Sequence, residues 1–390
     1  MRDTAVAGLA RLLGRPEWRA SPHGEAITAA IRTAQQDESS LVRMHAAQAA
    51  GALYADGPPG ERVAAIGHLL LDEPDPRVQD VLLTCLWREA HRHPNQVDDI
   101  LQQFTSTPMD GPADGDGAEQ GLDEGVKEKS RKASWYEADE HRRLFVALLT
   151  DLAVVHQTSF ATGRLEVWVS SSPRFADEVQ AMAQSLRDAI TVHADADTRG
   201  RAFQLLTTAV ENALDRWSRD QSEHLPQAEL STQDRAELEG AVKIADTIAD
   251  QIYFASGAYE HDQESGPPAG PDHEGFAVRA LPVLETCART KLAPIVHRVV
   301  ETLIFLGPLN DKRALLAIAA LVSADDEYTR DPLAGGEVIP YLTRLLAEQR
   351  QLVLFDDEGV TAFRHLLAAF AGVGNESAQE LAFTFADVFR

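Results

Sequence analysis

Apolar side chains recur at intervals of three and four residues along most of the chain, the spacing of helices with one buried face. Four stretches show the pattern clearly: Val78, Val81, Leu82, Cys85 and Leu86; Phe203, Leu206, Val210, Ala213, Leu214 and Trp217; Leu238, Ala241, Ala245, Ile248 and Ile252; and Val360, Phe363, Leu366, Leu367 and Phe370. Only Leu165–Val169 alternates in the manner of a strand, and we interpret this short run as an irregular connection or a minor hairpin. The pattern therefore predicts an all-α protein.

Helix start signals accompany the periodic stretches. Pro76 stands just before the stripe that begins at Val78, and proline is favoured in the first turn of a helix because the N–H that it lacks has no partner there. Ser231 precedes the helix that contains Leu238, and Asp234 follows three residues later. This spacing predicts a turn resembling a capping box.

Two segments interrupt the helical pattern. Ser106–Ser134 is rich in Gly and Asp and changes from acidic to basic, while Glu260–Gly275 is acidic and contains several Pro and Gly residues. Both have too few apolar groups to offset the entropy of ordering, so we predict two disordered loops. They divide the chain into helical blocks over residues 1–105, 135–259 and 276–390.

Residues 37–53 read DESSLVRMHAAQAAGAL, with an aspartate six residues before an arginine, then small residues and a final Gly-x-Leu. This arrangement resembles the consensus of HEAT repeats, whose positions are occupied here by Asp37, Val42, Arg43, Ala46, Ala47, Gly51 and Leu53. Alignment of Val42 with Val78 gives a second unit, in which Glu73 stands in place of Asp37 and Gln79 in place of Arg43. The resemblance covers residues 24–90, with weaker echoes from Asp197 and from Asn310.

The resemblance implies a right-handed α-solenoid of stacked antiparallel helix pairs. In this family an aspartate and an arginine form a ladder that joins neighbouring inter-helix turns. A single helix pair cannot bury its apolar stripe alone, so pairs stack in a row and each contacts its neighbours. Such an array curves, and its concave surface is a natural docking groove.

The charge balance bears on the partners that we expect. The chain has 61 acidic against 36 Lys and Arg residues, a formal net charge of −25. Proteins that bind nucleic acid need a basic face, so nucleic acid is not the expected partner. An acidic surface instead favours solubility and association with a basic protein surface. The preference for arginine over lysine, with abundant alanine, indicates a bacterial coding sequence.

The cysteines and the apolar segments indicate a cytoplasmic protein. Cys85 and Cys287 lie far apart within helical patterns, so we predict two buried, unpaired thiols. The N-terminus lacks the apolar core of a signal peptide. The most apolar stretch, Leu292–Leu309, contains His297, Arg298 and Glu301, which argues for a core helix and against a membrane span.

The search for catalytic or metal-binding motifs gives only weak candidates. His91 and His93 are two residues apart, so on a helix they would not converge without a ligand from elsewhere, and they fit a helix end before Pro94 better. Three carboxylate runs are better explained as solvated faces or helix caps: Asp98–Asp99, Asp325–Glu327 and Asp356–Glu358. We therefore predict no catalytic residue, no metal site and no cofactor.

A few residues are candidates for partner contacts. Trp135, Tyr136 and Trp168 are aromatic groups that could anchor a protein partner, although packing on their own helices is the simpler explanation. The Lys127–Lys132 cluster is expected to be solvated. The arginines Arg142, Arg143, Arg199 and Arg201 are candidates for a local basic patch.

These observations favour a non-enzymatic scaffold or adaptor that binds a protein with a basic surface. Such a scaffold would act alone or as the recognition part of a larger bacterial assembly, for example in defence or immunity. Two alternatives stay open: a HEAT-like protein that binds or processes nucleic acid, and a structural module that assembles with copies of itself. The sequence does not define the oligomeric state.

Overall fold

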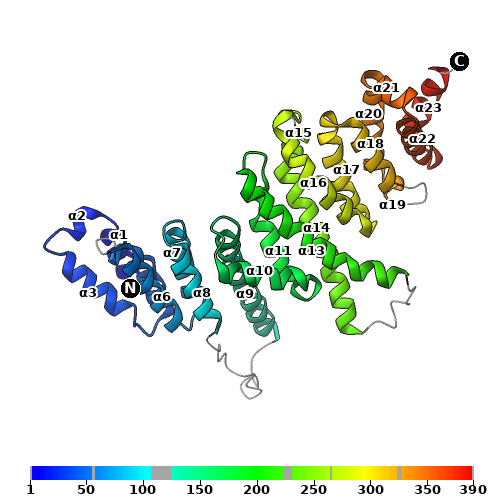
Figure 1. Cartoon of the computed structure of the whole chain (residues 1–390). Helices are drawn as coiled ribbons and strands as arrows, with labels where there is room; N and C mark the ends of the chain where they lie inside the picture. Colours follow the sequence, from blue (N-terminus) through cyan, green and yellow to red (C-terminus); the bar gives the residue numbers. More distant parts are fainter. Residues whose placement is uncertain are drawn as a thin grey trace. The chain divides into compact units, whose positions relative to one another are not determined.

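The protein is all-α in the computed structural model (Figure 1), which confirms the predicted class. The structure describes residues 2–54, 58–106, 124–222, 231–263, 266–322 and 327–388. Side chains are not described at 59, 124–138, 216–222, 332 and 387–388. Over the described ranges there are 23 α-helices and no strand. They form two compact units, Met1–Leu165 and Glu166–Arg390.

The first unit contains nine helices and the first half of a tenth. Their bounds are α1 Arg2–Leu13, α2 Pro16–Arg19, α3 Gly24–Ala34, α4 Ser40–Gln48, α5 Ala50–Leu53, α6 Pro59–Asp72, α7 Pro76–Ala90, α8 Pro94–Ser106, α9 Glu124–Val154 and α10 Ser159–Ser170. Helices α1, α4, α7 and α9 pack in succession, each on the next, and α3, α6 and α8 each pack against a helix of this row. These contacts bury the predicted stripe of α7, since Val78, Leu82, Cys85 and Leu86 are at most 8% exposed.

Helix α7 begins as the sequence predicts. Pro76 is its first residue, and the Asp75 side chain immediately before it accepts a hydrogen bond from the Arg77 backbone N–H at 3.0 Å. A carboxylate in this position satisfies one of the free N–H groups of the first turn. The predicted cap of α14 (Thr232–Ser256) is also present, because Ser231 Oγ accepts from the Asp234 N–H at 3.1 Å.

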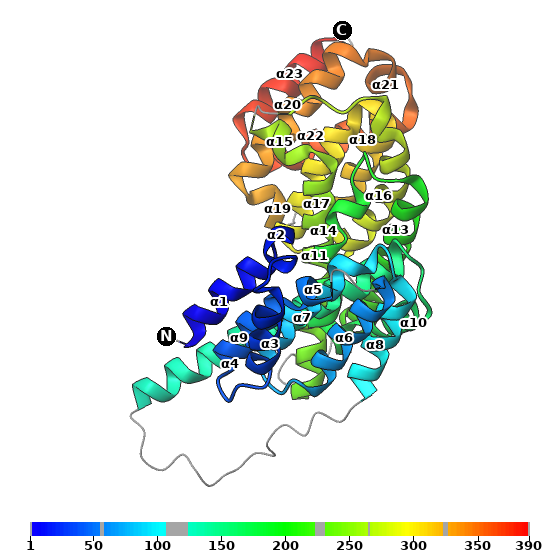
Figure 2. The same ribbon diagram turned by 90° about the vertical axis from the view of Figure 1, so that its left-hand side faces the viewer.

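The second unit is built around α14. The remaining helices are α11 Ala176–Ser185, α12 Arg187–Ile190, α13 Ala196–Ser222, α15 Ala258–Asp262, α16 Glu274–Cys287, α17 Ala293–Leu306, α18 Asp311–Leu321, α19 Glu327–Arg330, α20 Pro332–Glu348, α21 Arg350–Phe355, α22 Asp357–Gly372 and α23 Glu376–Val388, with 3-10 turns at Ser172–Phe175, Pro271–His273, Ala288–Thr290 and Gly307–Leu309. Helices α11, α13, α16 and α17 all pack against α14 (Figure 2). Its predicted stripe residues Ile248 and Ile252 are accordingly fully buried.

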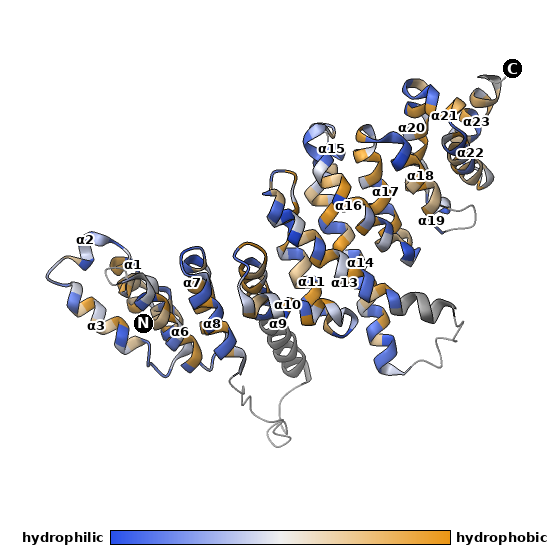
Figure 3. Cartoon of the chain, viewed as in Figure 1, coloured by the Kyte–Doolittle hydropathy of each residue, from blue (hydrophilic) through white to orange (hydrophobic). Residues whose placement is uncertain are grey.

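Within each unit the helices carry apolar and polar residues on different faces (Figure 3). The stripe on α22 follows its prediction, with Phe363, Leu366 and Phe370 buried. Over the described ranges no single helix is long and apolar enough to cross a membrane. One pair bent by 113°, residues 139–154 and 159–170, passes that test jointly by length and composition.

The strand-like run Leu165–Val169 is part of helix α10, so its interpretation as an irregular connection or hairpin is wrong. Leu165, Trp168 and Val169 are buried, whereas Glu166 and Val167 are exposed. Burial at positions i, i+3 and i+4 is the helical pattern, which five residues are too few to distinguish from alternation.

The prediction of a disordered loop over residues 260–275 is also wrong for the part that the structure describes. Helix α15 runs to Asp262, a 3-10 turn covers Pro271–His273 and α16 begins at Glu274. The rings of His261 and His273 each lie 5.5 Å from the Phe305 ring on α17. These contacts order a segment that its Pro, Gly and charge content marked as a loop. In the other predicted loop, 106–134, residues from Glu124 onward belong to α9, and residues 107–123 lie outside the described ranges.

Candidate functional site

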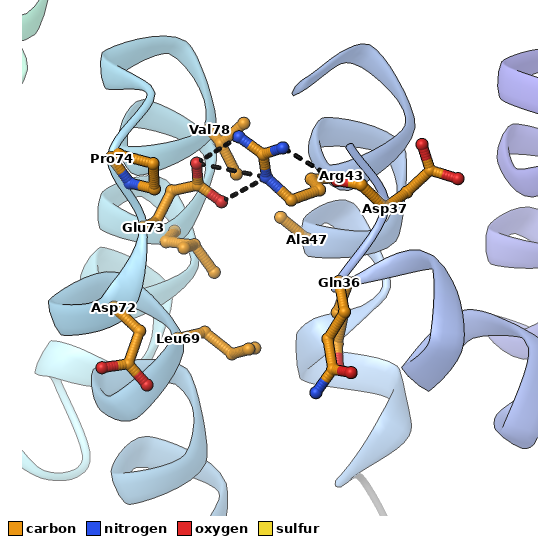
Figure 4. Close-up of a pocket in the computed structure, with 11 residues that line it drawn as sticks. Gln36, Asp37, Arg43, Ala47, Leu69, Asp72, Glu73, Pro74 and Val78 are labelled. Carbon is orange, nitrogen blue, oxygen red and sulfur yellow. Dashed lines mark hydrogen bonds and ion pairs between the residues drawn. The ribbon is translucent and has the colours of Figure 1, made fainter. Parts of the chain in front are cut away.

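The first candidate is the pair of turns that join α3 to α4 and α6 to α7. Arg43 on α4 reaches across to Glu73, the residue after α6 (Figure 4). Its Nη2 lies 2.8 Å from Glu73 Oε1 and its Nε lies 2.9 Å from Oε2, which is a bidentate contact. A pocket of about 420 Å³ lies beside this ion pair.

The two turns have the same internal bonding. Arg43 Nη1 donates to the Asp37 carbonyl at 2.8 Å, and Gln79 Nε2 donates to the Glu73 carbonyl at 2.6 Å. The Asp37 carboxylate accepts the Ser39 N–H at 2.9 Å, and the Glu73 carboxylate accepts the Asp75 N–H at 3.0 Å. In the second turn, Glu73 and Gln79 therefore form the same hydrogen bonds that Asp37 and Arg43 form in the first turn.

The other residues that match the repeat consensus lie on helices α4, α5 and α7. Val42 is buried in a cluster with residues of α1 and α3, Val78 is buried on α7, and Gly51 and Leu53 are half-buried in α5. Asp37 also forms an exposed ion pair with Arg2, at 3.2 Å. The polar groups of this region bond mainly to one another, so we assign it a structural role.

A larger candidate site lies in the second unit. A pocket of about 780 Å³ opens between α14, α15, α17 and α20, and we call it the acidic pocket. Its lining consists of four aromatic rings, three carboxylates, two arginines, a histidine and small or apolar groups: Tyr253, Tyr259, His261, Asp262, Gln263, Pro268, Ala269, Arg298, Glu301, Ile304, Phe305, Pro308, Gly336, Glu337, Pro340, Tyr341 and Arg344.

Both arginines of the acidic pocket are already paired. Arg298 contacts Asp250 at 3.1 Å and Glu301 at 2.9 Å, and its guanidinium carbon lies 4.7 Å from the Tyr253 ring centroid. Arg344 contacts the buried carboxylate of Asp311 at 2.6 Å. The lining thus holds three carboxyl groups against two guanidinium groups, and carboxylates already engage both guanidinium groups.

Two glutamates that line the acidic pocket also contact a histidine on α17. His297 Nε2 on α17 lies 3.2 Å from Glu337 Oε1 and 3.5 Å from Glu301 Oε1. Burial, followed by the charge of Glu301, raises the pKa of Glu337 to about 8. Glu337 Oε2, His297 Nδ1 and Tyr328 Oη are buried without a hydrogen-bond partner. This cluster is close enough to hold a divalent cation, but Arg298 already provides Glu301 with a positive charge.

A second group of this kind lies in the first unit. His91 at the end of α7, Asp151 on α9 and His156 after α9 place one ligand atom each within 4.8 Å of one another. A ligand from elsewhere in the chain lies beside His91, because His91 Nδ1 is 3.2 Å from His156 Nε2. These histidines are 65 positions apart in the chain, so no local sequence motif indicates the site.

Of the residues predicted to contact a partner, Trp168 is 3% exposed and is therefore packed in the core. The side chains of Trp135, Tyr136 and the Lys127–Lys132 cluster lie outside the described residues. Arg143 pairs with Asp139 at 2.7 Å, and Arg199 donates to the Val192 carbonyl at 2.8 Å.

The carboxylate runs are partly explained by helix capping. Asp356 accepts the Gly359 N–H at the start of α22. Asp98, which is 3% exposed, accepts from Thr158 Oγ1 and from the N–H groups of Phe160 and Ala161, all within 2.9 Å. It thus caps α10 from a neighbouring helix, a role that its sequence neighbours did not indicate.

The two cysteines are buried and unpaired, as predicted. Burial raises the pKa of both thiols, so neither is an activated nucleophile. The chain matches no protein-family model, and no curated protein sequence matches it significantly.

Proposed function

We propose that this protein is a non-enzymatic scaffold of HEAT-like helix pairs that holds a basic segment of a partner protein in the acidic pocket. The observation that carries the proposal is the composition of that pocket, where aromatic rings and carboxylates face one cavity. Arginine and lysine side chains bind to this combination through charge and through contact with ring faces.

The HEAT-like part of the proposal is supported by the turns of the first unit. Two successive inter-helix turns repeat the same side-chain-to-carbonyl bond, and Arg43 joins one turn to the carboxylate of the next. Such a contact is what the Asp–Arg ladder of the family would supply, with glutamate in the place of aspartate. Stacked helix pairs of this kind present long surfaces for protein partners.

The backbone of α20 adds an acceptor to the acidic pocket. Pro340 lies inside this helix and has no N–H to donate to the carbonyl of Gly336, four residues earlier. Both residues line the pocket, beside the point where this helical hydrogen bond is missing. A guanidinium group brings five N–H donors and suits a site that combines carboxylates with backbone carbonyls.

The proposal predicts a pH-dependent affinity for an arginine peptide. With a pKa of about 8, Glu337 is mostly protonated at pH 7 and mostly ionised at pH 9. If the cation binds the ionised form, its affinity rises over this range by up to about tenfold, since apparent affinity scales with the competent fraction. Arginine itself keeps its charge throughout.

The experiment measures fluorescence anisotropy of a labelled glycine–serine peptide that carries arginine, at 0.15 M salt to screen general attraction to an acidic protein. A citrulline version of the peptide is the uncharged control. We expect Glu337→Gln to remove the rise with pH, and Glu211→Gln, an exposed change on α13, to keep it. Equal binding of both peptides, or an unchanged pH profile in Glu337→Gln, would contradict the proposal. Tighter binding to a DNA duplex of similar length would favour the nucleic-acid alternative.

A further inference from the structure

His91 at the end of α7 and His156 after α9 face a partly buried carboxylate, Asp151 on α9. His91 Nδ1 and His156 Nε2 lie 3.2 Å apart, and the carboxylate of Asp151 reaches within 4.8 Å of both. Asp151 Oδ2 is buried and has no hydrogen-bond partner. A buried carboxylate oxygen in this state attracts a hydrogen-bond donor or a cation, because its desolvation is otherwise uncompensated.

The separation of the two imidazole nitrogens fits a shared metal ion. Zinc binds histidine nitrogen at about 2.0–2.1 Å in a tetrahedral geometry, which places two such nitrogens about 3.3 Å apart. A hydrogen bond between the rings explains the same distance but leaves Asp151 Oδ2 unpaired. A metal ion accounts for all three groups.

Hydrogen bonds in the turn after α9 hold His156 in position without a bound metal ion. The Val155 N–H donates to the Asp151 carbonyl at 2.9 Å, and the Thr158 N–H donates to the Leu152 carbonyl at 3.2 Å. Between them Gln157 adopts a left-handed conformation with φ of 56°, uncommon for a residue other than glycine. Thr158 Oγ1 is also bonded to the buried Asp98. This turn fixes His156 beside the end of α7.

The local charges favour a cation as well. Asp151 supplies a negative charge to the group, which attracts a cation towards the two imidazole nitrogens. The cluster in the acidic pocket differs in this respect, because Arg298 lies 2.9 Å from Glu301 and competes for the same carboxylate.

We propose that His91, Asp151 and His156 bind a divalent transition metal of the zinc class, with water in the remaining coordination position. Two imidazole nitrogens and one carboxylate are ligands that suit Zn²⁺ and not the oxygen-binding ions Ca²⁺ and Mg²⁺. His91 is exposed, so the ion is reached from solvent. Bound metal would tie the end of α7 to the turn that follows α9.

The test is titration of the whole, chelator-treated chain with Zn²⁺ by calorimetry, and with Co²⁺ by visible absorption. We expect one tight site per chain and the visible bands of tetrahedral Co²⁺. His91→Ala removes an exposed ligand without disturbing the core and should weaken Zn²⁺ binding by at least tenfold, since loss of a supporting residue alone costs about 10- to 100-fold. Asp151→Asn, which keeps the shape of the side chain, should also weaken it.

The matched control is His93→Ala, two residues along the chain and outside the cluster. It should bind Zn²⁺ as the unmodified protein does. Equal weakening by His91→Ala and His93→Ala would show scattered surface binding and overturn the proposal. Failure to bind Zn²⁺ in a one-to-one ratio would overturn it too, and would leave the two rings as a hydrogen-bonded pair.

Discussion

The ion pair of Arg43 and Glu73 and the cluster of His297, Glu301 and Glu337 both place carboxylates in poorly solvated positions, yet they differ in how well these groups are satisfied. Glu73 accepts two bonds from Arg43 and one from a backbone N–H. Glu337 keeps a buried oxygen without a partner. The first arrangement stabilises two neighbouring turns. In the second, burial beside a cavity raises the pKa of Glu337.

The largest expected effect comes from breaking the satisfied pair. The side chains of Arg43 and Glu73 are 15% and 7% exposed, so Arg43→Ala would leave a carboxylate that is almost buried without its cation. Removal of one partner of a buried pair typically costs about 3–5 kcal/mol. We expect a loss of about 3 kcal/mol in the free energy of unfolding, measured by urea denaturation.

A double variant distinguishes loss of the pair from loss of packing. Arg43→Met combined with Glu73→Leu removes both charges and keeps most of the volume. We expect it to recover much of the stability, because no charge stays buried alone. A double variant as unstable as Arg43→Ala would show that the pair itself, and the carbonyl bonds of Arg43, hold the turns together.

The next effect concerns the unsatisfied group. The pKa of Glu337 rises from an ordinary value near 4.5 to about 8, so the folded state holds a proton that the unfolded chain releases. Stability conferred by this proton is complete below pH 4.5 and is lost as the pH rises to about 8. We expect a loss on the order of 2 kcal/mol after allowance for partial exposure.

Glu337→Gln should flatten this decline, because glutamine does not titrate. The measurement is the free energy of unfolding at several pH values between 4 and 9 for the unmodified chain, for Glu337→Gln and for Glu211→Gln. Parallel curves for the unmodified chain and Glu337→Gln would show that folding does not raise the pKa of Glu337. A flattened curve in Glu211→Gln would assign the slope to overall charge.

The helices were predictable where a stripe was long, and less so where it was short. Ile248 and Ile252 belong to a long stripe, and their burial follows directly from their spacing. The prediction for Leu165–Val169 was wrong because a run of five residues fits the helical and the strand period equally well. The prediction of a disordered loop over residues 260–275 was wrong for another reason. The composition is that of a loop, but histidine contacts with Phe305 order the segment. Composition cannot reveal a tertiary contact.

The candidate sites were less predictable than the helices. The resemblance drew attention to Arg43 and to Glu73, but their contact depends on how α4 and α7 pack. The acidic pocket takes its lining from four helices, so no local motif marks it. The partner of His91 is likewise distant in the chain. Spacing identifies faces of single helices, whereas sites of this kind exist only after the helices have assembled.

The smallest expected effect has the opposite sign in pH and concerns Asp75, in the turn between α6 and α7. The hydrogen bond from Arg77, opposed by partial burial, lowers the pKa of Asp75 to about 2 from an ordinary value near 3.8. A carboxylate with a lowered pKa adds stability above pH 4, which is lost as the pH falls towards 2. Because the Arg77 side chain is 56% exposed, solvent screens the pair and Asp75→Asn should cost less than about 1 kcal/mol at pH 7.

Urea denaturation between pH 2 and pH 7 should show a shallower acid decline in Asp75→Asn and no change above pH 7. If Asp75→Asn instead altered the slope between pH 5 and pH 8, the assignment of that slope to Glu337 would be wrong, and the contrast between the satisfied turn and the strained pocket would lose its main support.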